Sequence, residues 1–236
     1  MARFVRRLMD ELMQSERLAS AGYGGNGMVI DGGRGANYST DDIEKKVRPS
    51  FLAKYAAQAV KDIKKYYEET TGYVPSFTQV RNLTLKAIEP IRNRFTREVR
   101  GVVHGDYRLD NRDISLNAYS LDAPEVADSS TKKELRGLGL TKPLYDALVH
   151  ELTHAAQHQL GIIGNYTKRF KALSRLAIEG ATTHQTYEIT GKPQPEYRKE
   201  QKFFKKIMNL TRSKKNAVLG WVPHLRQSPM YTSVAA

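Results

Sequence analysis

Apolar residues recur at helical spacing over several long stretches of this chain. Between residues 50 and 72 they follow a period of about 3.6 residues, which predicts an amphipathic helix with Ser50 as a candidate N-cap and Gly72 at its end. Similar patterns predict helices over residues 4–20, 142–160, 168–190 and 196–212. A largely helical protein is therefore expected.

Strand-like patterns are confined to the middle of the chain. Residues 101–109 and 113–121 flank the turn-forming run from Asp110 to Asp113, which predicts a β-hairpin. Residues 76–98 fit either a helix kinked at Pro90 or an alternating strand, and both remain open. The polar segment 122–141 predicts a loop with a short helix near residues 132–135. Helices combined with a hairpin indicate the α+β class.

Glycine is concentrated near the start of the chain. The run from Ala21 to Thr40 is dense in glycine and follows the predicted helix 4–20, as a flexible connector does. We therefore expect residues 1–40 to form an N-terminal arm, for which a pro-segment is one interpretation, and residues 41–236 to form the main domain.

Charge indicates the class of partner. The 236 residues include 38 Lys and Arg against 25 Asp and Glu, a net charge of +13 that favours contact with polyanions. The region from Lys192 onward is especially basic, so the predicted helix 196–212 and the Arg-rich N-terminus are candidates for binding nucleic acid or an anionic membrane surface. The simpler interpretation is that the apolar stripe of this helix packs on the domain and its lysines are solvated.

Three features that the sequence lacks limit the possible chemistry and cellular location. No apolar run approaches 18 residues and no secretory signal is recognised, so we expect no transmembrane segment and a cytoplasmic protein, with association with a particle as an alternative. The chain has no cysteine, which excludes disulfides, thiolate zinc ligands and cysteine nucleophiles. Any metal must be held by histidines and carboxylates.

The run His150-Glu-Leu-Thr-His154 lies within the predicted helix 142–160. Histidines four residues apart share a helix face, so both imidazoles can reach one ion. Glu151 is one residue round the helix and is placed to act on a water molecule at the metal. Neutral imidazoles suit Zn²⁺, although Mn, Co and Ni also bind such sites. The alternatives are two solvated surface histidines, or a metal site without hydrolytic activity.

A catalytic zinc ion needs a third protein ligand. Glu179 stands alone in the small and apolar run 177–181, where an unpaired buried carboxylate would be costly. Metal ligation would explain it, and Gly180 would let two helices pack closely. A surface glutamate is the plain alternative, and the rival ligands are His158, His184 and Glu188.

His150-Glu151-x-x-His154 with Glu179 on a following helix resembles the gluzincin type of zinc metallopeptidase. The resemblance covers roughly residues 100–191, because Gly105-Asp-Tyr107 with Ile114-Ser-Leu-Asn117 is similar to the edge strand of that clan. It implies a zincin-like α+β fold, with a small mixed sheet above the active-site helix and a backing helix that carries the glutamate. It also implies that a peptide substrate binds antiparallel to the edge strand.

The implied reaction is peptide-bond hydrolysis, with Zn²⁺ on His150, His154 and Glu179 and with Glu151 as general base. The developing oxyanion needs a further donor, for which His224 and Tyr187 are candidates beside His184. Asp146 is a candidate to orient an imidazole, although a solvated aspartate is the plain interpretation. The alternative function is a basic structural or nucleic-acid-associated protein with a non-catalytic zinc site.

Overall fold

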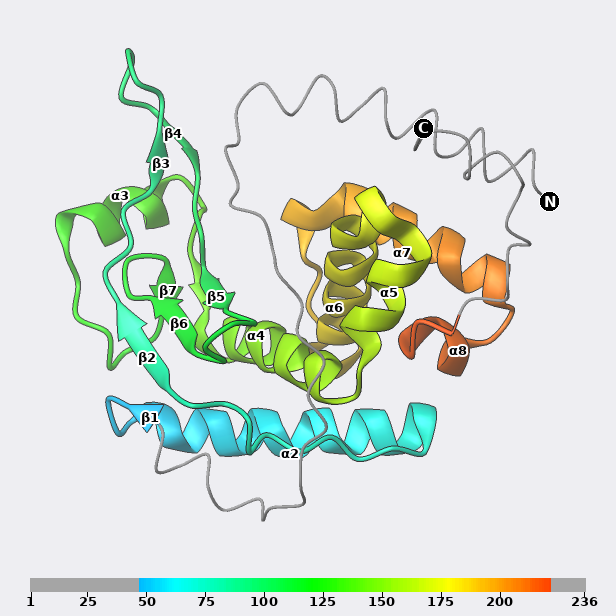
Figure 1. Cartoon of the computed structure of the whole chain (residues 1–236). Helices are drawn as coiled ribbons and strands as arrows, with labels where there is room; N and C mark the ends of the chain where they lie inside the picture. The colour runs from blue at the N-terminus through cyan, green and yellow to red at the C-terminus, as the bar shows by residue number, and fades with distance from the viewer. Residues whose placement is uncertain (1–46, 222–236) are drawn as a thin grey trace. The chain divides into compact units, whose positions relative to one another are not determined.

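The computed structural model describes residues 47–221, which form helices and small sheets of a mixed α+β class (Figure 1). The predicted arm over residues 1–40 and the candidate His224 lie outside the described residues. Among the helices that are described, none is long and apolar enough to cross a membrane.

The long amphipathic helix predicted near the start is α2, Leu52–Thr71. Gly72 ends it in the left-handed conformation at φ 76°, and its N–H donates to the Glu68 carbonyl at 2.9 Å. The prediction of Ser50 as the cap is wrong, because Phe51 occupies the N-cap position and no side chain caps the helix. The buried face of α2 comprises Leu52, Ala56, Ala59, Val60, Ile63, Tyr66, Tyr67 and Thr71.

A four-stranded mixed sheet lies against the helices, in the order β1-β2-β6-β5. Its strands are β1 (Val47–Arg48), β2 (Leu83–Lys86), β6 (Ile114–Asn117) and β5 (Gly105–Tyr107). The first three are parallel, whereas β5 runs antiparallel to β6. Within the described residues, β5 forms an edge of the sheet. The hairpin predicted over residues 101–121 is therefore confirmed.

The segment left open by the sequence, residues 76–98, forms strands and not a kinked helix. It contains β2 and then β3 (Ile91–Arg92), which pairs antiparallel with β4 (Val99–Gly101). This two-stranded ribbon extends from the sheet at the end away from α2 (Figure 1).

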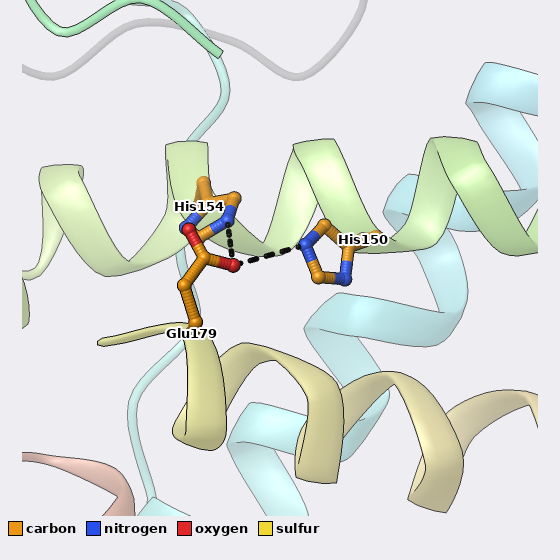
Figure 2. A group of neighbouring side chains, drawn as sticks. All are labelled: His150, His154 and Glu179. Carbon is orange, nitrogen blue, oxygen red and sulfur yellow. Dashed lines mark ion pairs between the residues drawn. The ribbon is translucent and has the colours of Figure 1, made fainter. Parts of the chain in front are cut away.

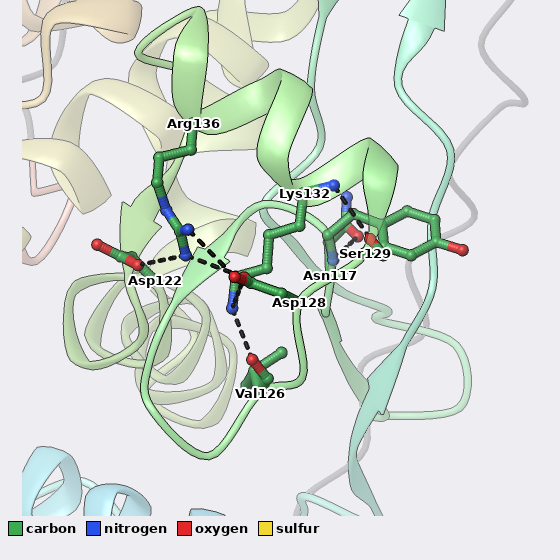
Figure 3. A network of polar contacts seen from close by, with 8 residues as sticks. Asn117, Asp122, Val126, Asp128, Ser129, Lys132 and Arg136 are labelled. Atoms are coloured by element: carbon green, nitrogen blue, oxygen red, sulfur yellow. Dashed lines mark hydrogen bonds and ion pairs between the residues drawn. The ribbon is translucent and has the colours of Figure 1, made fainter.

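The polar segment 122–141 forms a loop and the helix α3, Ser130–Gly137, which confirms and lengthens the predicted short helix. The loop is closed by two cationic side chains of α3 (Figure 3). Lys132 is buried and donates to the Val126 carbonyl at 2.8 Å, while Arg136 pairs with Asp122 at 3.3 Å and Asp128 at 3.1 Å. Strand β7 (Leu121–Asp122), at the start of this segment, pairs in parallel with β8 (Lys142–Pro143), which lies just before the next helix.

Five helices complete the described chain: α4 (Leu144–Gln159), α5 (Ile162–Phe170), α6 (Ser174–Thr190), α7 (Arg198–Thr211) and α8 (Lys214–Val218). The prediction of one helix over 168–190 is wrong at its start. Lys171 adopts a positive φ of 45°, and a 3₁₀ turn over Lys171–Leu173 separates α5 from α6.

Helix α6 packs against α4 on one side and α7 on another. The predicted role of Gly180 in close helix packing is confirmed, because a β-carbon there would lie 2.2 Å from the backbone oxygen of Glu200 on α7. Phe203, Phe204 and Ile207 of α7 are buried, so the apolar stripe of this basic helix packs on the domain.

Candidate metal centre

Helix α4 carries the two histidines of the motif on one face, with their ring centroids 5.0 Å apart. Helix α6 runs beside it and directs Glu179 toward both rings (Figure 2). Oε2 of Glu179 lies 3.4 Å from Nε2 of His150 and 3.5 Å from Nε2 of His154. The structure thus brings together the three predicted ligands, whose donor atoms all lie within 4.8 Å of one another.

Two of the three spacings between these donors fit a tetrahedral zinc ion. Zinc–nitrogen and zinc–oxygen bonds of about 2.0–2.1 Å give a tetrahedron whose edges are about 3.3–3.4 Å. The two nitrogen–oxygen separations of 3.4 and 3.5 Å are close to that edge length. Two imidazoles and one carboxylate are also a donor set that zinc accepts in catalytic sites.

Thr182 contacts the ring nitrogen of His154 that does not face Glu179. Its Oγ1 is buried and lies 3.2 Å from Nδ1 of His154, while its own hydroxyl is within 2.8 Å of the Ile178 carbonyl. Donation of the hydroxyl to that carbonyl leaves Oγ1 to accept from Nδ1–H. His154 then has its lone pair on Nε2, the nitrogen that faces Glu179. Thr182 was not predicted from the sequence, although its position three residues after Glu179 places it on the same helix face.

Asp146 is not the solvated aspartate of the plain interpretation. It is buried one turn before His150, and its Oδ1 lies 3.5 Å from Nζ of Lys192. Nδ1 of His150 is buried without a hydrogen-bond partner among the described residues, so no direct bond joins it to Asp146.

Burial and neighbouring charges shift the pKa values of the three candidate ligands in different directions. Burial lowers the pKa of His150 to about 4, which leaves its imidazole neutral. Burial acts in the same direction on His154, but the carboxylates of Glu179 and Glu151 outweigh it and raise the pKa. Glu179 is kept ionised, because His154 and His150 offset its burial and hold its pKa well below the usual range.

Glu151 lies beside the cluster and is not one of its three donors. The side chain is buried, and burial raises the pKa of its carboxyl to about 7. It packs against β5, where a β-carbon on Gly105 would approach Oε1 to 2.7 Å. A carboxylate with this pKa, close to the candidate metal ligands, is suited to take up and release a proton near neutral pH.

The rival ligands lie elsewhere. Nδ1 of His158 is 2.8 Å from the Tyr107 hydroxyl, so this residue ties α4 to strand β5. His184 packs on Phe204 with ring centroids 5.2 Å apart. Glu188 forms an ion pair with Lys214 at 2.7 Å. None of the three rivals belongs to the cluster of donors.

Of the predicted oxyanion donors, Tyr187 lies on α6 eight residues after Glu179, about 12 Å further along the helix axis. Its side chain is 47% exposed. A different tyrosine, Tyr197, lies at the candidate metal centre. Its ring stacks on His150 with centroids 5.1 Å apart and planes 21° apart. Burial, followed by the nearby carboxylates of Glu179 and Glu151, raises the pKa of Tyr197, so its hydroxyl stays protonated.

Tyr197 belongs to the connection between α6 and α7, which is held over α4 by an ion pair. Nζ of the buried Lys142 lies 2.9 Å from Oε1 of Glu196 and 5.8 Å from the centroid of the Tyr197 ring. Nothing local in the sequence signals that Tyr197 reaches His150, because the contact depends on how this connection folds back.

The comparisons with known proteins add no assignment: no protein-family model, curated protein or solved structure matches the chain.

Proposed function

We propose that this chain is a zinc-dependent metallopeptidase with a zincin-like fold, which hydrolyses peptide bonds of a polypeptide substrate. The observation that carries the proposal is the spacing of His150, His154 and Glu179, with Glu151 adjacent to them but outside the donor set. A structural zinc site has four protein ligands, whereas a catalytic site has three and keeps a position open. Three donors gather here among the described residues.

Strand β5 supports a peptide as the substrate. The His104 carbonyl accepts from Asn117 N–H at 2.9 Å, and Arg108 N–H donates to the Asp113 carbonyl at 3.0 Å, so these residues face β6. Alternation along the strand turns the N–H and C=O groups of Gly105 and Tyr107 toward the opposite edge. Those groups are able to pair with an extended peptide next to Glu151.

When bound, zinc would polarise the scissile carbonyl and lower the pKa of a water molecule to about 7. Glu151 takes a proton from the attacking water and delivers it to the leaving amine. Tyr197 donates its hydroxyl proton in a hydrogen bond to the oxygen on which negative charge develops. This role was predicted for Tyr187 or His224, and the stacking on His150 favours Tyr197.

The test compares the wild type with Glu151→Gln, both loaded with zinc, on fluorescently labelled casein. We expect the wild type to cleave casein and the variant to lose cleavage while both bind one zinc per chain. If both proteins hold zinc and neither cleaves, the centre is non-catalytic and the basic structural protein becomes the better interpretation. Cleavage by Glu151→Gln at the wild-type rate would contradict the assigned base.

A further inference from the structure

The ribbon of β3 and β4, together with its turn, forms a basic hairpin over residues 91–101. Its base is fixed to the sheet and to α3. Asn117, which is buried in β6, donates to the Val103 carbonyl at 2.8 Å and accepts from Ile88 N–H at 3.1 Å (Figure 3 shows its position). Arg92 forms a two-pronged ion pair with Glu134 of α3, at 2.9 and 2.5 Å. The direction in which the hairpin projects is thus determined by the fold.

The turn of the hairpin presents an aromatic side chain to solvent. Oδ1 of Asn93 accepts from Phe95 N–H at 2.9 Å and from Thr96 N–H at 3.4 Å, and Arg97 N–H donates to the Asn93 carbonyl at 3.0 Å. Arg97 itself adopts a positive φ of 62°. Within this ordered turn Phe95 is 88% exposed, more than any other large hydrophobic residue of the described chain.

The hairpin also carries positive charge that is not compensated locally. Residues 91–101 include four arginines and one glutamate. Arg92 is paired with Glu134, whereas Arg94, Arg97 and Arg100 are exposed. No acidic side chain within residues 47–221 forms an ion pair with any of these three. An exposed surface with three arginines and one aromatic ring is complementary to an acidic chain that also carries apolar groups.

Only residues 102–104 separate the hairpin from the edge strand that contacts Glu151. A peptide that pairs antiparallel with β5 runs from the Tyr107 end toward the Gly105 end, so its C-terminal part continues toward the hairpin. Arg100 precedes Gly105 by five residues, at most about 18 Å of extended chain. Ile91 and Val103 are 36% and 39% exposed along this path and offer apolar contacts.

We propose that the basic hairpin is an exosite for acidic polypeptide substrates, which recognises Asp and Glu residues C-terminal to the scissile bond. This inference rests on the metallopeptidase function proposed above. A polypeptide is favoured over a single-stranded nucleic acid because the hairpin leads directly into a strand edge that can pair with a peptide backbone. Bases stacking on Phe95 would make no use of that edge.

Binding is tested first, without catalysis, on full-length Glu151→Gln loaded with zinc. The probes are two fluorescein-labelled twelve-residue peptides that alternate Glu or Gln with Ala and Phe, measured by anisotropy at low and moderate salt. Three exposed ion pairs predict about tenfold tighter binding of the Glu peptide at low salt, with a smaller difference as salt rises. The preference should disappear in the triple variant Arg94→Gln, Arg97→Asn, Arg100→Gln, where Asn tolerates the positive φ.

A matched control removes three charges elsewhere, by Lys199→Gln, Lys202→Gln and Lys205→Gln on the exposed face of α7. It should keep the preference, and circular dichroism should show both triple variants folded. Equal binding of the two peptides, or a preference that survives in the hairpin variant, would overturn the proposal. Displacement of the Glu peptide from the hairpin by tighter binding of oligo-dT would assign this surface to nucleic acid instead.

Cleavage then separates the exosite from the proposed function. Wild type and hairpin variant digest the same mixture of proteome-derived peptides, and mass spectrometry maps the cut sites. Enrichment of Asp and Glu C-terminal to the cuts, lost in the variant, supports the exosite. Cutting without that enrichment overturns the exosite and keeps the peptidase. If no peptide is cut, but the Glu peptide still binds more tightly than the Gln peptide and does so through the hairpin, the peptidase proposal fails. The recognition of acidic chains by the hairpin then stands.

Discussion

Gly105 and Glu151 are in direct contact, so close that a β-carbon on the glycine would lie 2.7 Å from both Cγ and Oε1 of the glutamate. Atoms do not approach so closely, and strand β5 therefore reaches this position only because residue 105 has no side chain. The proposed substrate-binding edge of β5 is therefore in direct contact with Glu151, the proposed general base.

Replacing Gly105 by Ala is expected to displace Glu151 and leave the metal ligands in place. The carboxylate is the flexible partner, and a shift of about 1 Å in a catalytic group costs roughly 100-fold in rate. We expect kcat/KM on labelled casein to fall by about that factor, with zinc affinity unchanged in a chelator competition. Gly137→Ala is the control, because a β-carbon there meets nothing within 4 Å. Wild-type kcat/KM in Gly105→Ala would show that the contact does not position the base.

Replacing Tyr197 by Phe tests the assigned hydrogen-bond donor. The ring would still stack on His150, so zinc binding and KM should change little. Removing one donor to an oxyanion costs about 100- to 1,000-fold in kcat, and we expect a loss of that size. Tyr187→Phe is the matched control and should retain the wild-type kcat. A large loss in Tyr187→Phe with none in Tyr197→Phe would return the role to the residue predicted from the sequence.

Replacing Thr182 by Val should weaken zinc binding. The substitution removes the hydroxyl that lies 3.2 Å from Nδ1 of His154 and preserves the shape of the side chain. Loss of such a partner behind a ligating histidine costs about 10- to 100-fold in metal affinity. Thr186→Val provides the control, since this buried hydroxyl donates only to the Thr182 carbonyl one turn away. Equal affinities for the two variants would mean that Thr182 does not support the ligand.

Local sequence patterns predicted that His150, His154 and Glu179 lie together, because the relevant geometry is local. Histidines four residues apart in a helix must share a face, and a lone carboxylate among small apolar residues needs a partner. The α2 helix and the β5–β6 hairpin were likewise determined by periodicity and by turn residues that lie close together in the chain.

The contacts that surround the ligands could not be predicted in this way. Tyr197 reaches His150 only through the fold of the α6–α7 connection, and Lys142 reaches Glu196 across 54 residues of sequence. The break between α5 and α6 depends on Lys171 adopting a positive φ, which its residue type does not favour. Such features depend on tertiary packing, which overrides local preference.

Zinc binding should release protons in a manner that reports the state of the two histidines. The pKa of His150 is lowered to about 4, so this ligand is already neutral at pH 6. The pKa of His154 is raised, so at pH 6 it carries a proton that the metal must displace. We expect release of about one proton per zinc at pH 6 in Glu151→Gln, which lacks the carboxyl that also titrates near pH 7, measured with a pH indicator in weak buffer. At pH 9 the released proton comes from the metal-bound water, whose pKa the metal lowers to about 7.

The sign of the pH dependence follows from this proton. Loss of the His154 proton should make zinc affinity rise by up to about tenfold per pH unit below about pH 7, and ionisation of the metal-bound water should continue the rise above it. The release at pH 9 measures the water and serves as the internal control. Release of two protons per zinc at pH 6 would mean that His150 is also charged in the metal-free protein. A constant affinity from pH 6 to pH 7 would mean that neither histidine is charged in the metal-free protein.

Replacing Gly180 by Ala should destabilise the protein through the contact between α6 and α7. The new β-carbon would lie 2.2 Å from the Glu200 backbone oxygen and 2.9 Å from Cβ of Phe204, so the two helices must separate. Overpacking of this kind costs about 1–3 kcal/mol of unfolding free energy, measured by urea denaturation. Gly164→Ala in α5 is the matched control, since its β-carbon meets nothing within 4 Å and alanine favours a helix by about 1 kcal/mol. If Gly180→Ala were as stable as Gly164→Ala, close approach of α7 would not be what requires glycine beside Glu179.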